Sequence, residues 1–417
     1  MLRALTSARA ERNRADGEAA GSYDPPANGF GVYVHVPFCS RRCDYCAFAT
    51  WDDRHHLWER YVAAARAEAV SAGGALWKGR GPATSVFFGG GTPSLLPAEL
   101  LIGALYAVKA NLGVAPGAKV TVECNPETVT RQKLTAYRDA GVTRLSFGVQ
   151  SMVPAVLASL GRQHDPAAVR RAAQLAGEEG FASSYSVDLI FGAAGETMSD
   201  WESCLDEVLA LEPPPSHVSA YALTVEPGTP LSRRPQRWPD EDDQAEKYMR
   251  ADEVLSGHGL EWYEISNWAR PGRRCAHNLL YWAQGEYVGL GCAAHSHQVG
   301  PGGRSRRWWN VRTPQRYCRL VEDGSSPEAA GEELGPEEQE FEALTLSLRT
   351  YRGVPPWAVP EELFEQGLVE LKPGSLSAGG GARAVLTRRG RLLANEVASR
   401  LAAPAVAVAG RGRSRRA

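Results

Sequence analysis

Three cysteines share one short stretch of the chain, Cys39-Ser-Arg-Arg-Cys43-Asp-Tyr-Cys46. Thiolates are soft ligands, and three of them on one loop can each bind a different iron of a [4Fe–4S] cubane. The fourth iron then has no protein ligand and is free to bind a small molecule directly. The spacing therefore predicts an iron–sulfur cluster that a cosubstrate can reach.

A zinc site is the alternative for this stretch. A closed zinc site needs four ligands, and the nearest histidines in the sequence are His35, His55 and His56. The chain has 8 cysteines in 417 residues, and the other five are scattered. A disulfide scaffold is thereby excluded, and a tight cluster of thiols in a reducing compartment indicates a metal site.

The elements that must position these cysteines alternate between short β-branched runs and longer helical segments. The pattern predicts strands at 32–36, 85–88, 120–123, 144–149, 185–191 and 217–223. It predicts helices at 57–72, 97–112, 131–140, 167–179 and 200–211. Such alternation specifies an α/β fold with a parallel sheet. An open, partial (β/α) barrel and a wound open sheet both satisfy it.

Polar or glycine-rich residues follow these strands: the cysteines, the turn 89–92, Glu123, Gln150, Asp188 and Tyr221. Ligands of parallel α/β folds bind at the carboxyl ends of the strands. We therefore expect one shared site at that rim.

Differences in amino-acid composition along the chain indicate its division into domains and terminal segments. We expect a disordered leader at 1–28, the barrel at 29–250, an irregular extension at 251–336, a small helical domain at 337–402 and a basic disordered tail at 403–417. The net charge of −2 argues against a nucleic-acid binder. The sequence shows neither a signal peptide nor an apolar run of about twenty residues, so we expect a cytoplasmic protein.

Several motifs, taken in order, resemble the radical-SAM superfamily, in particular its coproporphyrinogen-dehydrogenase-like branch. The first is Tyr33-Val-His-Val-Pro-Phe-Cys39 with the cysteines that follow, and the second is Phe87-Phe-Gly-Gly-Gly-Thr-Pro93. Val122-Glu-Cys-Asn-Pro126, Leu145-Ser-Phe-Gly-Val-Gln150 and Val187-Asp-Leu-Ile-Phe-Gly192 continue the series. The resemblance covers about residues 29 to 400 and implies a partial barrel of radical-SAM type.

Within that branch the chain looks most like the heme chaperones. The dehydrogenases of the branch typically carry a further cysteine two positions after the third cluster ligand, where this chain has Phe48. In addition, His277-Asn278-Leu-Leu-Tyr281-Trp282 matches the HNxxYW motif associated with heme binding in the chaperones. Without the family, His277 would be interpreted as a structural histidine.

The resemblance also implies a set of cofactor-binding residues. Residues matching the S-adenosyl-L-methionine (SAM) site are Tyr33, Tyr45, Gly90, Gly91, Thr92, Glu123, Gln150, Arg162 and Asp188. The last three match positions that bind a second SAM in the dehydrogenases, and a rim ion pair of Arg162 with Asp188 is the structural alternative. The residues matching the heme site are His277, Asn278, Tyr281 and Trp282, with His277 as axial ligand. Secondary candidates for the heme iron are His295 and His297. Cys275 and Cys292 are near His277 in the sequence, but we expect them to be buried thiols that serve as small apolar residues rather than groups that approach heme.

The expected function is therefore that of a heme chaperone that carries a [4Fe–4S] cluster and SAM and passes heme to an acceptor hemoprotein, such as one of the respiratory chain. The resemblance is compatible with a homodimer and with peripheral contact to a membrane. The alternative is an enzyme, an oxygen-independent coproporphyrinogen III dehydrogenase. A radical-SAM methyltransferase of the same branch is a third reading, but it gives no particular reason for His277.

Overall fold

Six parallel strands form the centre of the protein in a computed structural model that describes residues 29–75, 77, 79–162, 165–300, 304–373 and 381–401. The predicted leader and basic tail lie outside these residues. The strands are β1 (Phe30–Val36), β2 (Ala83–Gly90), β3 (Val114–Cys124), β4 (Arg144–Gln150), β5 (Tyr185–Phe191) and β6 (His217–Ala222). All six predicted strands are present, most of them longer than the β-branched run that indicated them.

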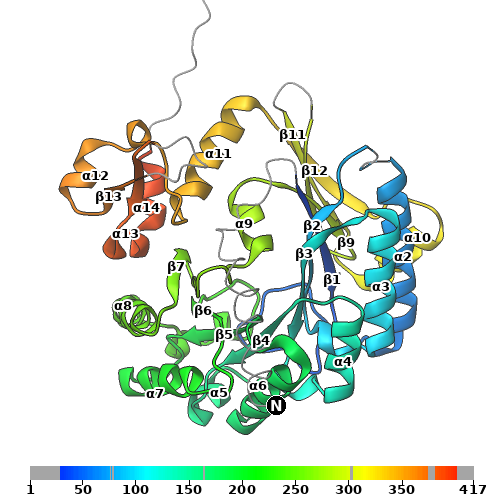
Figure 1. Cartoon of the computed structure of the whole chain (residues 1–417), viewed down its shortest axis with the longest axis horizontal. Helices are drawn as coiled ribbons and strands as arrows, with labels where there is room; N and C mark the ends of the chain where they lie inside the picture. The colour runs from blue at the N-terminus through cyan, green and yellow to red at the C-terminus, as the bar shows by residue number, and fades with distance from the viewer. Residues whose placement is uncertain are drawn as a thin grey trace, which may run out of the picture. The chain divides into compact units, whose positions relative to one another are not determined.

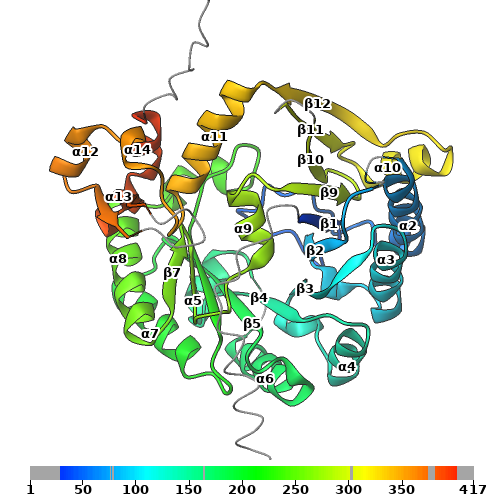
Figure 2. The same cartoon turned by 45° about the horizontal axis from the view of Figure 1, so that its top comes forward.

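The strand order decides between the two predicted architectures. Each of the six strands pairs in parallel with the next one along the chain, in the order β1-β2-β3-β4-β5-β6. A doubly wound sheet reverses its order at a switch point, whereas a barrel winds in one direction. The fold is therefore an open (β/α) barrel, and its curvature is visible in Figures 1 and 2.

Helices cover the outer side of this curved sheet (Figure 2). They are α2 (Trp58–Ala75), α3 (Ala98–Asn111), α4 (Arg131–Asp139), α5 (Pro154–Ser159), α6 (Pro166–Ala176), α7 (Met198–Leu209) and α8 (Glu241–Gly257). One further short helix, α9 (Ala276–Trp282), lies on the inner side of the curve. Side chains alternate along each strand, so one face of the sheet contacts the helices and the other faces α9.

The prediction of an irregular extension at 251–336 is wrong. This segment forms β7 (Glu261–Glu264), β8 (Asn267–Ala269), β9 (Glu286–Leu290), β10 (His295–Val299), β11 (Ser305–Asn310), α10 (Pro314–Glu322) and β12 (Glu328–Leu334). The strands lengthen the sheet at both edges: β8 pairs antiparallel with β6, and β9 pairs parallel with β1. An open barrel leaves two unpaired edges, and these added strands pair with them.

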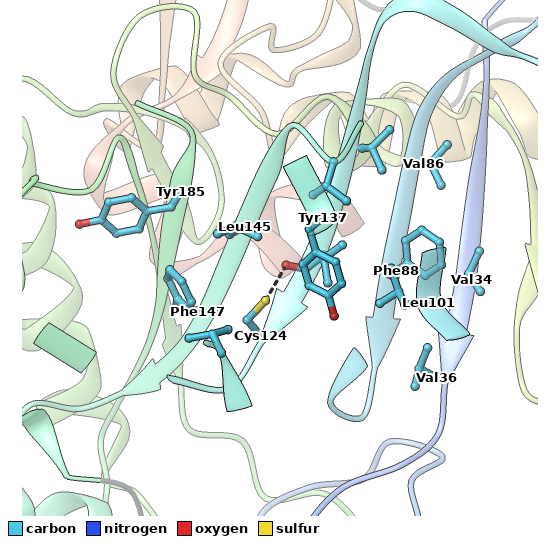
Figure 3. Packing of buried hydrophobic residues seen from close by; sticks show 14 of the residues in the cluster. Val34, Val36, Val86, Phe88, Leu101, Cys124, Tyr137, Leu145, Phe147 and Tyr185 are labelled. Atoms are coloured by element: carbon cyan, nitrogen blue, oxygen red, sulfur yellow. Dashed lines mark hydrogen bonds between the residues drawn. The ribbon is translucent and has the colours of Figure 1, made fainter. Parts of the chain in front are cut away.

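The hydrophobic core lies between the outer face of the sheet and the helices. Val34 and Val36 of β1 and Val86 and Phe88 of β2 are all buried in it (Figure 3). Further along the sheet the core continues through Leu145, Phe147 and Tyr185 (Figure 3). Because this face is filled by packing, the alternate residues of the same strands are left to build the site on the inner face.

The chain divides into two compact units. The first takes in the described residues up to 281 together with 285–298 and 307–331, and the second takes in 282–284, 299–306 and those from 332 onward. The second unit contains α11 (Pro336–Leu348), α12 (Glu361–Glu365), α13 (Arg388–Leu392) and α14 (Ala394–Ser399). It also contains an antiparallel pair of strands, β13 (Val369–Lys372) and β14 (Arg383–Leu386), which the prediction of a small helical domain did not include. Among the described residues, no helix is long and apolar enough to cross a membrane.

Candidate functional site

The three predicted cluster cysteines lie on the loop that follows β1, here called the cysteine loop (residues 37–51). Two backbone hydrogen bonds close it, from Cys39 N to Trp51 O at 3.0 Å and from Trp51 N to Pro37 O at 2.7 Å. Two histidines contact its carbonyls: His35 Nε2 lies 2.9 Å from Ala49 O, and His55 Nε2 lies 2.7 Å from Cys39 O. These histidines, weighed above as zinc ligands, thus position the backbone of the loop.

Each of the three thiols has at least one polar partner. Thr92 Oγ1 lies 3.8 Å from Cys39 Sγ, Arg162 Nη1 lies 3.5 Å from Cys43 Sγ, and Thr50 Oγ1 lies 3.9 Å from Cys46 Sγ. Hydrogen bonds and positive charge stabilise thiolate ligands and tune the potential of a cluster. The residues present therefore fit a cluster held by three cysteines. No group of three His, Cys, Asp or Glu in the described part of the chain is arranged to hold a single metal ion.

Burial keeps the thiols of Cys39 and Cys46 protonated in the protein alone. Desolvation raises the pKa of Cys39 to about 11 and also raises that of Cys46. Only the thiolate is a metal ligand, so iron must displace these protons as it binds.

The glycine run after β2 lies directly against the cysteine loop. Gly91 N donates to Val36 O and Thr92 N to Phe38 O, both at 2.8 Å. A Cβ on Gly91 would lie 2.6 Å from Phe38 O, and Gly90 has a φ of +112°. Glycine is therefore required here by close backbone approach and by a left-handed conformation. The run leaves backbone, rather than side chains, facing the site.

A cavity of about 450 Å³ opens at the carboxyl ends of β2 to β6. Of the nine residues predicted to bind SAM, Tyr33 alone is not among its lining residues; Tyr45, Gly90, Gly91, Thr92, Glu123, Gln150, Arg162 and Asp188 all line it. These eight residues thus share one cavity at the carboxyl ends of the strands. Their role as SAM ligands stays a prediction.

Two carboxyl groups give the cavity an acidic side. Burial, together with the charge of Asp188, raises the pKa of Glu123 to about 8, although Gly90 N donates to its Oε2 at 3.1 Å. Burial likewise raises the pKa of Asp188, which accepts a hydrogen bond from Ser146 Oγ at 3.0 Å. A cation bound beside such groups would favour their charged form. SAM carries a sulfonium and an ammonium group, so the donor set fits it.

Arg162 and Gln150 complete the polar lining. Arg162 Nη2 donates to Asn125 Oδ1 at 3.2 Å and to Gly148 O at 3.1 Å, while Nη1 faces Cys43. No ion pair joins Arg162 to Asp188 among the described residues, so the rim ion pair considered above is wrong. Gln150 ends β4 with a φ of +65°, at an irregularity of the strand pairing. Such backbone conformations in non-glycine residues are concentrated at functional sites.

The lining residues that were not predicted include Phe48, Asn125 and Ser146. Asn125 and Ser146 stand inside motifs that were recognised, two residues after Glu123 and directly after Leu145, and period-two alternation along β4 would have pointed Ser146 inward. Phe48 is 69% exposed at the cavity, where a large apolar side chain has no packing role.

His277, the predicted heme ligand, is buried on the inner face of the barrel. Its Nδ1 lies 2.9 Å from Ser85 Oγ and its Nε2 lies 2.8 Å from Tyr281 Oη. The ring stacks on Phe87, with centroids 5.3 Å apart, and burial lowers its pKa to about 3. The imidazole is therefore neutral, and both of its nitrogens have hydrogen-bond partners.

The rest of the motif lies around this histidine. Asn278 Oδ1 accepts from Cys275 Sγ at 3.4 Å, and the Tyr281 ring packs edge-on against His277 with centroids 4.7 Å apart. Trp282 is the first residue of the second unit. Cys275 is buried. So is Cys292, which lies 3.6 Å from the Tyr61 hydroxyl.

An open barrel whose first strand leads into a three-cysteine loop, next to a glycine run and an acidic cavity, defines a radical-SAM protein. The family model described as Radical SAM superfamily matches residues 33–208. Among solved structures, the Escherichia coli coproporphyrinogen III oxidase HemN superposes with a TM-score of 0.75 at 21% identity, covering 93% of this chain and 92% of HemN. This likeness confirms the fold.

The sequence relatives narrow the class. "Heme chaperone HemW" of Mycobacterium tuberculosis H37Rv is 40% identical over 388 residues, which are 91% of this chain and 96% of that protein. The E. coli heme chaperone HemW is 36% identical over 69% of this chain and 75% of its own length. The chain belongs to the HemW family.

Proposed function

We propose that this protein binds heme and transfers it to an acceptor hemoprotein, on a radical-SAM scaffold. The observation that carries the proposal is the 40% identity, over 96% of its length, to a protein named heme chaperone HemW. The HNxxYW sequence adds support, because α9 places its histidine on the inner face of the barrel rather than in the outer core.

The scaffold is proposed to hold a [4Fe–4S] cluster on Cys39, Cys43 and Cys46 and SAM in the acidic cavity. The glycine backbone and the Glu123 carboxylate would bind the amino-acid and ribose groups of SAM. When both groups are bound, they supply one-electron chemistry. Arg162 contacts Cys43 Sγ and donates to Asn125 Oδ1, so its charge would stabilise a Cys43 thiolate bound to the cluster and it holds Asn125 at the cavity.

The proposed heme site comprises His277, Asn278, Tyr281 and Trp282. A neutral imidazole is the form that binds iron, and the low pKa of His277 keeps it in that form. To bind through Nε2, His277 must release the Tyr281 hydroxyl, a loss of about 1 kcal/mol that the iron bond can offset. Ser85 would then hold the other nitrogen, as partners of metal-bound histidines usually do.

The wider setting follows from the proposed activity. A heme chaperone needs an acceptor, which we take to be a hemoprotein such as one of the respiratory chain, and delivery there would involve peripheral contact with a membrane. A cytoplasmic location and a homodimer are compatible with this role. The net charge of −2 gives no reason to add a nucleic acid to these partners.

One arrangement favours an enzyme instead. Gln150, Arg162 and Asp188, which match second-SAM positions of the dehydrogenases, line a single cavity with Glu123. An oxygen-independent coproporphyrinogen III dehydrogenase would cleave SAM reductively and use the resulting radical to take hydrogen from propionate side chains. An anaerobic assay with coproporphyrinogen III, SAM and a reductant decides the matter, because only the enzyme forms protoporphyrinogen IX.

The direct test of the chaperone is a heme titration of the full chain after anaerobic reconstitution of the cluster, followed at the Soret band. We expect saturation near one heme per chain, and weaker binding in His277→Ala. His258→Ala is the matched control, because His258 is exposed at the end of α8. A wild-type protein that binds no heme saturably would refute the chaperone function.

A further inference from the structure

We propose that His297 of β10 is a ligand of the heme iron and binds it through Nε2. The inference rests on the proposed heme-binding function and names a residue of that site outside the HNxxYW motif. Four observations carry it: the tautomer of His297, the absence of a partner on its second nitrogen, its position in the sheet, and the contrast with the other buried histidines.

The hydrogen bond of His297 fixes its tautomer. Nδ1 lies 2.9 Å from Gly285 O. A carbonyl oxygen only accepts, so Nδ1 must carry a proton, and in a singly protonated ring the lone pair is then on Nε2. Metal-binding histidines usually have this arrangement, in which one nitrogen donates to a carbonyl or carboxylate and the other faces the metal.

Nε2 has no partner of its own. Among the described residues nothing forms a hydrogen bond with it, although His297 is only 2% exposed. Buried polar atoms in folded proteins are nearly always paired, and one that is not calls for a ligand or another explanation. A lone pair held in a fixed direction without a proton donor is available to a metal.

The strand register places His297 on the same face of the sheet as the motif. His297 is the cross-strand partner of Tyr287 on β9, and Tyr287 is the partner of Gly31 on β1. Residues in register across a sheet point to the same side. The space above Gly31 is filled by His277, whose Cε1 would lie 3.0 Å from a Cβ at that position. His277 and His297 therefore stand on one face, two strands or ~10 Å apart along the sheet.

Aromatic rings join the two histidines. The Tyr281 and Tyr287 centroids are 4.6 Å apart, and the Tyr287 and His297 centroids are 5.9 Å apart. A porphyrin is a flat apolar ring of about this span, and tyrosine and histidine side chains suit its faces and its iron. Heme bound beside α9 would thus bring its iron within reach of β10.

The other buried histidines lack one of these features. Both nitrogens of His277 are bonded to hydroxyls, and both of His35 are bonded, to Tyr33 Oη and to Ala49 O. His217 does have a nitrogen without a partner, but it stands on β6, whose neighbours are β5 and β8. Within the described chain, His297 alone combines an available nitrogen with a place beside the motif.

The experiment is electron paramagnetic resonance and visible spectroscopy of ferric heme bound to the full chain, with the variants His297→Ala, His277→Ala and His258→Ala. We expect an iron with two histidine ligands, His277 and His297, in the wild type. His297→Ala should bind heme at least tenfold more weakly and change from this two-histidine signature to that of a single histidine ligand, and free imidazole should restore the two-ligand signature. His258→Ala should behave like the wild type.

A second substitution guards against misfolding. Methionine is close to histidine in size and also binds heme iron, so His297→Met should give a methionine-ligated spectrum. An unchanged histidine signature in His297→Met, or its loss in His277→Ala alone, would overturn the inference and leave the heme-binding function intact. If the wild type binds no heme, the proposed function fails, and the inference fails with it.

Discussion

Gly90 lies between the cysteine loop and the cavity. Its φ is +112°, and an added Cβ would lie 2.4 Å from the His35 ring. His35 in turn holds the loop at Ala49 O. We therefore expect Gly90→Ala to lower the free energy of unfolding by about 3 kcal/mol, through backbone strain and overpacking together. The iron content after reconstitution should fall as well. Denaturant titration measures the free energy of unfolding, and iron analysis measures the iron content.

Gly195→Ala provides the control for this substitution. Gly195 also has a positive φ, of +83°, but no atom lies within 4 Å of its added Cβ. Gly195→Ala should therefore lower the free energy of unfolding through backbone strain alone, by about 1 kcal/mol, and leave the iron content normal. Equal effects of the two substitutions on stability and on iron would show that the contact with His35 is unimportant.

At the scale of the element, α9 is positioned by segments that are distant in the sequence. Arg144 Nη1 of β4 donates to Arg273 O at 3.0 Å, and Cys275 N donates to the Tyr263 hydroxyl of β7 at 3.3 Å. These bonds fix the residues just before the helix begins. The helix then packs over Gly31, whose missing side chain leaves room for Leu280 and His277.

Gly31→Ala should displace this helix. Its Cβ would lie 2.6 Å from Leu280 Cδ2 and 3.0 Å from His277 Cε1. Overpacking of this kind costs about 1–3 kcal/mol, and we expect heme affinity to fall about tenfold while iron content stays normal. Gly81→Ala, with no atom within 4 Å of the added Cβ, is the control for heme titration and thermal unfolding. Unchanged heme binding in Gly31→Ala would separate α9 from the heme site.

The elements show what the sequence could predict. The six strands of the barrel were predictable, because their β-branched runs are long and are separated by periodic helices. The short strands β7 to β12 were not, since each forms only by pairing with a sheet edge that the local sequence does not reveal. Most of the polar residues that line the cavity were predictable, because their motifs come directly after predicted strands. The hydrogen bond of His277 with Ser85, 192 residues away, could not be inferred from either segment.

For the whole molecule, burial of ionisable groups determines how stability depends on pH. Burial raises the pKa of five carboxyl groups: that of Glu123 to about 8, those of Glu68 and Glu264 to about 7, and those of Asp188 and Glu196 above their ordinary values. The folded chain thus holds protons that the unfolded chain has already lost above pH 4.5. Their contribution therefore declines as pH rises toward 8, by up to about 1.4 kcal/mol per pH unit for each group.

Three buried histidines affect the pH dependence of stability in the opposite direction. Burial lowers the pKa of His35 to about 4 and that of His277 to about 3, and it lowers that of His217 well below 6.5. The unfolded chain binds protons on these rings below pH 6.5, whereas the folded chain does not. Stability contributed by the neutral rings is therefore lost as pH falls from 6.5 toward 4.

The two sets together predict a stability maximum between about pH 4.5 and pH 6.5, where their slopes oppose each other. Above that range the carboxyl groups still titrate differently in the two states, so stability should fall as pH rises. Buried cysteines such as Cys124 and Cys204, whose pKa burial raises to about 12, act in the same direction near pH 9. The measurement is the urea midpoint of the cofactor-free chain from about pH 4 to pH 9.

Glu123→Gln should make the urea midpoint fall less steeply with pH on the alkaline side and leave the acid side unchanged, because glutamine does not titrate. Added SAM should also make the urea midpoint fall less steeply on the alkaline side, since a bound cation favours the charged carboxylate. A midpoint that rises steadily from pH 6.5 to 8 would show that these carboxyl groups are already ionised in the folded chain.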